Sequence, residues 1–200
     1  MERQRTLANL LKDYLLKDYP KEVILKDGAG VTLRPLADGD QDALFRMFHR
    51  FPKDELWFLN HDVNDPELIH DWVRNLNLNR VVSIVSLLEG RIIANAVLMM
   101  KGYGAKKHIG KIRIAVAPDM REKRLGTWML LDLINLAVAI GLKILVMRLI
   151  EDRDMSVIQG VKKLDFVERA ILEDYVLDME ENPHNLVILT KHLHTRWDDF

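Results

Sequence analysis

The stretch VAPDMREKRLG, Val116–Gly126, lies between two segments of different character. Before it, KIRIAVA is short and rich in β-branched residues, which is typical of a strand. After it, TWMLLDLINLAVAIG is long, apolar and closed by glycine, which is typical of a helix. The stretch is therefore a strand-to-helix turn, and it concentrates three basic side chains at one place in the chain.

The composition bounds the class of protein. The chain has 200 residues, of which 48% are hydrophobic and 30% charged, and its formal net charge is −1. These values predict a folded domain and give no electrostatic reason to expect nucleic acid. The absence of cysteine excludes disulfides, thiolate metal sites and a cysteine nucleophile. We find no signal peptide and no run of roughly 18 apolar residues that would span a membrane. We therefore expect a cytoplasmic protein with no membrane partner.

Hydrophobic periodicity and turn residues predict the order of the elements. The spacing of leucines predicts an amphipathic helix over Glu2–Lys17, ended by Pro20. Further helices are expected over 38–51, 65–76, 124–140 and 152–164, and strands over 22–25, 31–36, 80–90, 91–102, 108–117, 142–150, 166–180 and 185–193. This order predicts an α/β (α+β) domain over 21–200, built on one mostly antiparallel sheet that contains a βαβ unit, with a helical extension over 1–20.

The turn has the chemistry of an anion site. The first N–H groups of a helix have no helical partner, and the helix dipole attracts negative charge there. Arg121, Lys123 and Arg124 add positive charge, Gly126 permits close approach, and Thr127 offers a hydroxyl. A phosphate or pyrophosphate would suit this turn. The alternative is a solvated basic loop that happens to precede a helix.

The turn resembles the cofactor-binding motif of the GNAT superfamily of N-acetyltransferases, Arg/Gln-x-x-Gly-x-Gly/Ala after a strand ending in Val-x-Pro. Arg121 fills the first position of the motif and Gly126 the last, whereas Arg124 stands at the middle glycine. The resemblance implies acetyl-CoA as the cofactor. It implies that the preceding strand lines the pantetheine arm and that the turn holds the pyrophosphate, so the expected cofactor residues are Ile114, Ala115, Val116, Ala117, Arg121, Glu122, Lys123, Arg124, Leu125, Gly126 and Thr127.

Two further segments extend the resemblance to about Val31–Leu193. VTLRPLADGDQDALFRMFHRF is similar to the opening strand and first helix of the family, and the start of the domain is similar to bacterial protein-lysine acetyltransferases. RDMSVIQGVKKLDF is similar to the family segment E-N-x-x-A-x-x-x-Y-x-K-x-G-F. Here Asp154 takes the asparagine position, which adds it to the expected cofactor residues, and Val161 takes the tyrosine position.

The resemblance leaves the catalytic groups open. The glutamate base of the lysine-acetyltransferase-like members corresponds to about Lys111, and the tyrosine acid corresponds to Val161. Replacement candidates are His108, near the start of the same strand, and Glu173 and Tyr175, which share one face of a late strand. For each candidate, a surface or structural role is the simpler interpretation.

On the acceptor side, the resemblance places the predicted helices between Asp40 and Asn77. They carry an aromatic and acidic set that suits a cationic amine, and equally an ordinary core with a polar rim: Trp57, Phe58, His61, Asp62 and Trp72. The pair His192 and His194 is better explained as a polar strand end, so we assign no metal site.

Three functions remain open at this stage. The first is an N-acetyltransferase that acts on a protein lysine or a small amine. The second is a catalytically weak acyl-CoA-binding sensor or regulatory module of the same fold. The third is a structural or interaction protein without coenzyme A, whose leading helix mediates assembly. A homodimer is also considered.

Overall fold

A single eight-stranded sheet organises the computed structural model, which describes residues 7–59 and 61–193. The strands are β1 (Lys21–Ile24), β2 (Gly30–Pro35), β3 (Val81–Leu88), β4 (Arg91–Met100), β5 (Ile109–Val116), β6 (Ile144–Ile150), β7 (Val167–Leu177) and β8 (Pro183–His192). The helices are α1 (Leu7–Asp18), α2 (Gln41–Phe48), α3 (Lys53–Trp57), α4 (Pro66–Arg74), α5 (Leu125–Ala139) and α6 (Met155–Lys162), with a 3-10 turn η1 (Pro118–Met120).

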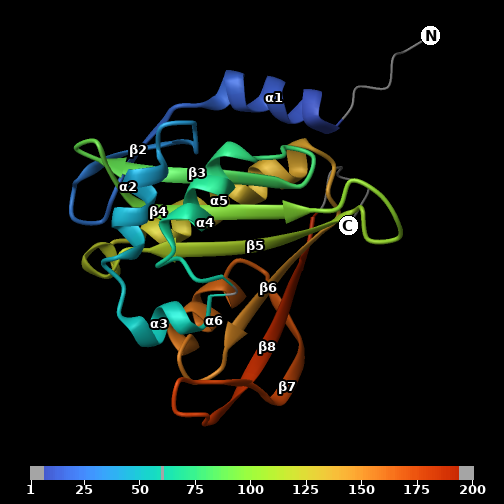
Figure 1. Ribbon diagram of the computed structural model, residues 1–200. Coiled ribbons are helices and arrows are strands. Elements are labelled where there is room, and N and C mark those ends of the chain that lie inside the picture. Colours follow the sequence, from blue (N-terminus) through green and yellow to red (C-terminus); the bar gives the residue numbers. More distant parts are fainter. Residues whose placement is uncertain (1–6, 60, 194–200) are drawn as a thin grey trace.

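The sheet confirms the predicted architecture. Its order is β1-β2-β3-β4-β5-β6-β8-β7, and only the pair β5 and β6 is parallel. Helix α5 connects these two strands, which is the βαβ unit expected from the sequence. Figure 1 shows α2 and α4 in front of the sheet and α5 behind it, so side chains from both layers bury the central strands.

Local signals place most element ends correctly. Asp65 caps α4 by accepting a hydrogen bond from the Glu67 N–H at 2.9 Å. Glu89 and Gly90 both have positive φ in the turn between β3 and β4. The expected helix 38–51 is shorter, because the Asp40 carboxylate binds Arg34 and the Ala37 N–H and thereby holds the preceding loop. Helix α3 was not predicted from the sequence, since five residues are too few to show a helical period.

The parallel pair opens after only three residues. Ile109, Gly110 and Lys111 pair with β6, whereas the rest of β5 has no partner on that side. Beyond this point β5 still pairs with β4, and β6 still pairs with β8. We call the region between 112–116 of β5 and 147–150 of β6 the split. Figure 1 shows the two strands diverging, with α3 and α6 between their separated ends.

The N-terminal helix is joined to the domain by a polar contact on α5. Asp132, a buried residue of α5, accepts hydrogen bonds from Lys21 Nζ at 2.7 Å and from the Tyr19 hydroxyl. Burial alone would lower the pKa of Lys21, but its hydrogen bond to Asp132 and the charge of that carboxylate raise it. Leu11 of α1 is fully buried in the core. The leading helix thus packs on its own domain.

We expect Asp132→Ala to lower the free energy of unfolding by about 2 kcal/mol, because it leaves Tyr19 and Lys21 without their common acceptor. Chemical denaturation monitored by circular dichroism measures the change. Asn135→Ala, at an exposed position of the same helix, is the control and should cost under about 0.5 kcal/mol. Equal stability of the two variants would contradict the account of how α1 is held.

Candidate functional site: the split and its strand-to-helix turn

The turn after β5 presents backbone N–H groups at the open end of the split. The first hydrogen bond of α5 runs from the Trp128 N–H to the Arg124 carbonyl at 3.1 Å. The N–H groups of Leu125, Gly126 and Thr127 precede it and have no acceptor in the helix. Arg124 is the N-cap residue and adopts a left-handed conformation with φ 65°. This explains why glycine suits the position in the family motif, although arginine occupies it here.

Two of the three basic side chains of the turn are already paired. Arg121 forms a two-pronged ion pair with Glu55 of α3, with one Nη1–Oε1 distance of 2.9 Å. Its hydrogen bonds to Glu55 raise the pKa of Arg121 and lower the pKa of that carboxyl group. Lys123 Nζ lies 2.8 Å from Asp27. Arg124 is exposed and has no ion-pair partner among the described residues.

Strand β5, which leads to the turn, has an unpaired backbone edge along which an extended ligand could bind. Ile114, Ala115 and Val116 are only half-buried although β5 is a central strand, because β6 leaves one edge of their backbone unpaired. Ala117 is fully buried. At Gly126, an added Cβ would lie 3.6 Å from Val116 Cγ2, which is an ordinary contact. Packing of the protein alone therefore does not require glycine at Gly126.

Helix α3 and the residue after it bridge the two halves of the sheet. On the β5 side, Glu55 binds Arg121, and the Phe58 carbonyl lies 3.5 Å from Arg113 Nη2. Trp57 Nε1 donates to the Leu177 carbonyl of β7 at 2.8 Å. The Phe58 ring packs edge-on against His184 of β8 and lies under the Arg153 guanidinium, 4.9 Å away. No sequence signal connects α3 to these partners, which are 55 to 126 positions away.

The remaining members of the predicted acceptor set make contacts of their own. His61 packs edge-on against Trp72 at 5.1 Å, and Asp62 accepts a hydrogen bond from the Asn64 N–H. These contacts make them part of the α3–α4 connection. The structure thus brings Trp57 and Phe58 to the separated halves of the sheet and leaves His61, Asp62 and Trp72 in local contacts.

Asp154 is placed at the end of β6, across the split from the turn. Its carboxylate accepts a hydrogen bond from the Ile150 N–H at 2.9 Å, and its own N–H donates to the Ile150 carbonyl. Its negative charge contributes to the raised pKa of Arg121. Asp154 therefore fixes the strand end and adds negative charge near the predicted anion site.

The catalytic candidates do not converge. His108 precedes β5 at its paired end, about 26 Å along the strand from Val116. Glu173 and Tyr175 lie on β7, which is separated from β6 by β8, and both are exposed. Regular alternation fails there, because the register shifts between Leu172 and Val176 and Asp174 has φ 50°. The prediction that Glu173 and Tyr175 share a face assumed regular alternation of side chains, and β7 is irregular at this place.

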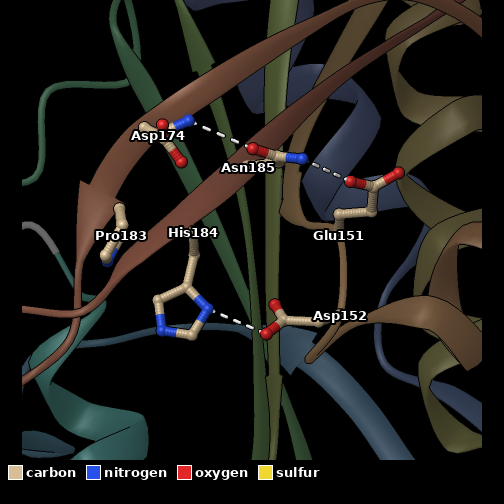
Figure 2. Close-up of a pocket in the computed structure, with 6 residues that line it drawn as sticks. All are labelled: Glu151, Asp152, Asp174, Pro183, His184 and Asn185. Carbon is tan, nitrogen blue, oxygen red and sulfur yellow. Dashed lines mark hydrogen bonds and ion pairs between the residues drawn. The ribbon is translucent and has the colours of Figure 1, made fainter.

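A polar cavity of about 260 Å³ lies on the far side of β6. It is lined by Glu151, Asp152, Asp174, Pro183, His184 and Asn185. In Figure 2, Asn185 accepts from the Asp174 N–H and donates to Glu151, while His184 points to Asp152 at 2.8 Å. The other ring nitrogen of His184 lies 3.4 Å from Asp178. Hydrogen bonds to Asp152 and then Asp178 raise the pKa of His184.

His184 should make stability depend on pH. A pKa that is raised in the folded state adds stability that is complete below about pH 6.5 and is lost as the pH rises through the folded pKa. We expect His184→Gln to lower the unfolding midpoint more at about pH 5.5 than at about pH 8.5. His49→Gln is the control, since the His49 ring contacts the Phe45 carbonyl and forms no ion pair with a carboxylate of the described residues. A His184→Gln effect that is constant over this range would contradict the assignment.

Neither a metal centre nor a membrane-spanning helix is found in the part of the chain that the structure describes. Within residues 7–59 and 61–193, no group of three or more His, Asp or Glu side chains is arranged to hold a metal ion. His194 of the predicted histidine pair lies outside the described residues. None of the described helices is both long and apolar enough to cross a membrane.

Comparison with known proteins identifies the fold. No family model and no curated protein matches the sequence. Among solved structures, the GNAT domain of PAT from S. lividans superimposes with a TM-score of 0.72 at 13% identity, covering 88% of this chain and 98% of that one. The ribosomal-protein-alanine N-acetyltransferase from Brucella melitensis gives 0.70 at 20% identity, covering 80% and 99%. The Salmonella typhimurium protein yncA, solved with its cofactor acetyl-CoA, gives 0.70 at 17% identity, covering 84% and 96%. The chain has the fold of the GNAT acetyltransferases, as its strand-to-helix turn predicted.

Proposed function

We propose that the protein is an N-acetyltransferase that transfers the acetyl group of acetyl-CoA to a primary amine. The observation that carries this proposal is the unpaired edge of β5, which leads directly to the free N–H groups at the start of α5. An extended amide-containing arm can pair with such an edge as an added strand does. A pyrophosphate suits the N–H groups at its end.

The residues divide the work of binding. The half-buried backbone of Ile114–Val116 offers hydrogen bonds to the arm, and the turn 121–127 offers N–H groups and the Arg124 guanidinium to the phosphates. In the reaction, the neutral amine nitrogen forms a bond to the acetyl carbon as the carbon–sulfur bond breaks. The amine loses one proton and the thiolate gains one, so the reaction needs no net acid or base.

A catalytically weak acyl-CoA sensor is the second candidate, and the residues at the catalytic positions favour it. Lys111 stands at the position of the family's glutamate base. Val161, at the position of the tyrosine acid, is buried in the core at 4% exposure. Among the described residues, strand β5 carries no carboxylate, histidine or tyrosine, so this strand offers no side chain for proton transfer.

The ion pair between Arg121 and Glu55 should oppose binding of coenzyme A. We expect Glu55→Gln to tighten binding severalfold, because it frees Arg121 for the phosphates. Arg121→Gln should weaken binding about 10-fold, the loss of one charge-assisted hydrogen bond. Calorimetric titration with coenzyme A measures both changes. Arg74→Gln on α4 serves as the control for general charge effects. Weaker binding by Glu55→Gln would show that the pair positions Arg121 and does not compete for it.

Turnover separates the two candidates. The full chain is incubated with acetyl-CoA and a panel of primary amines, and free thiol is followed against a reaction without amine. Amine-dependent thiol release, with the acetylated amine identified by mass spectrometry, is the result that we expect. Saturable binding of acetyl-CoA without amine-dependent release would identify the sensor. If the protein bound neither acetyl-CoA nor coenzyme A, both candidate functions would be overturned. The remaining hypothesis would be a structural or interaction protein.

A further inference from the structure

Arg113 is a partly buried cation that has no counter-ion among the described residues. Its guanidinium is only half-exposed, and its one hydrogen bond in the described chain is the long contact of 3.5 Å between Nη2 and the Phe58 carbonyl. Burial lowers the pKa of Arg113. By contrast, Arg34 and Arg121 bind the carboxylates of Asp40 and Glu55. Charged groups that are withdrawn from water are normally paired, so Arg113 has an unused capacity for an anion.

The described residues next to Arg113 in the register of the sheet are not acidic. Lys111 lies two positions earlier on β5 and therefore shares the same face of the strand. It has no ion-pair partner among the described residues. Their partners in register on β4 are Met99 and Val97. This face of β5 thus carries two cations, Lys111 and Arg113, and Lys111 stands at about the position of the glutamate base of the family.

Arg113 also lies at the narrow end of the split. Lys111 is the last residue of β5 that pairs with β6, and Arg113 follows two positions later. The turn lies beyond Val116, about 10 Å further along the strand. If the proposed function is correct, the phosphates lie at the turn and the arm follows the unpaired edge of β5. The thioester then lies toward the narrow end, and an acceptor must approach it there.

We propose that Arg113 binds a carboxylate of the acetyl acceptor, so that the acceptor is an amine that also carries a carboxylate group. A guanidinium presents two parallel N–H donors that match a carboxylate. The Phe58 carbonyl accepts only a long hydrogen bond from Arg113 Nη2. A carboxylate bound to the two guanidinium N–H groups would therefore replace this weak contact or share its donor. The positive charge of Lys111 strengthens the attraction. The inference rests on the proposed function for the identity of the acceptor, but the anion site itself can be tested without turnover.

The acidic cavity of Figure 2 does not compete for this role. Its residues lie beyond β6, where Asp152 is bound by His184 and Glu151 by Asn185. Phe58 lies between the two regions, with its carbonyl toward Arg113 and its ring against His184. The described cations at the narrow end of the split are therefore Lys111 and Arg113 of β5 and the exposed Arg148 of β6, and of these three Arg113 is the partly buried one.

The test uses a matched pair of product-like probes, N-acetylglycine and N-acetylglycinamide, which differ only in carboxylate against amide. The full chain is titrated with each, with and without saturating coenzyme A, and binding is followed through the arginine side-chain N–H signals in NMR spectra. The Arg113 signal is the one that Arg113→Gln removes. We expect the acid to bind at least about 10-fold more tightly than the amide and to shift that signal.

Two variants sharpen the outcome. Arg113→Gln retains a donor for Phe58 and should make the affinities for acid and amide equal, whereas Arg74→Gln should leave the difference intact. Arg113→Lys keeps the charge and should retain only part of the preference. Equal binding of the two probes to the unaltered protein would overturn the inference whatever the variants do. A separate titration with coenzyme A tells this failure from failure of the proposed function, since coenzyme A would still bind.

Discussion

The proposed site depends on the shortness of the parallel pairing between β5 and β6. Three residue pairs hold two halves of the sheet together, and beyond Lys111 each strand keeps only its outer neighbour. An unpaired strand edge within a sheet leaves backbone groups that water, another segment or a ligand must satisfy. Because the same edge runs into the first turn of α5, the fold places hydrogen-bonding backbone and an anion site in one line.

Charge is distributed unevenly around this split. Glu55 binds Arg121 and Asp154 lies across from it, so negative charge is present where phosphates are proposed to bind. At the narrow end, Lys111 and Arg113 are positively charged, and neither forms an ion pair with a carboxylate of the described residues. Helix α3 and Phe58 connect the two environments, since Glu55 binds Arg121 and the Phe58 carbonyl contacts Arg113 Nη2. Movement of α3 would therefore change both the turn and the narrow end of the split.

Much of the fold follows from local sequence signals, and much of the site does not. Short sequence patterns of a few residues predict the Glu89-Gly90 turn, the helix cap at Asp65 and the start of the long apolar helix after Arg124. Glu55 and Asp27 could not be identified as partners of Arg121 and Lys123, because ion pairs between distant segments leave no periodic pattern. The short helix α3 was missed for its length. The shared face of Glu173 and Tyr175 was inferred from regular alternation, which the register shift in β7 interrupts.

Binding of acetyl-CoA to the purified full chain tests the central claim most directly. The account predicts saturable binding in a calorimetric titration, with one site per chain and weaker binding when Gly126 is replaced by valine, because the added side chain stands beside Val116 at the turn. Gly126→Ala adds only a Cβ at an ordinary contact distance from Val116, so we expect the fold to be kept. Any loss of affinity in this variant would then report on the close approach of the ligand to the turn. Absence of binding in the folded, unaltered protein would contradict the account, and the split would then be a feature of the fold without a coenzyme A site.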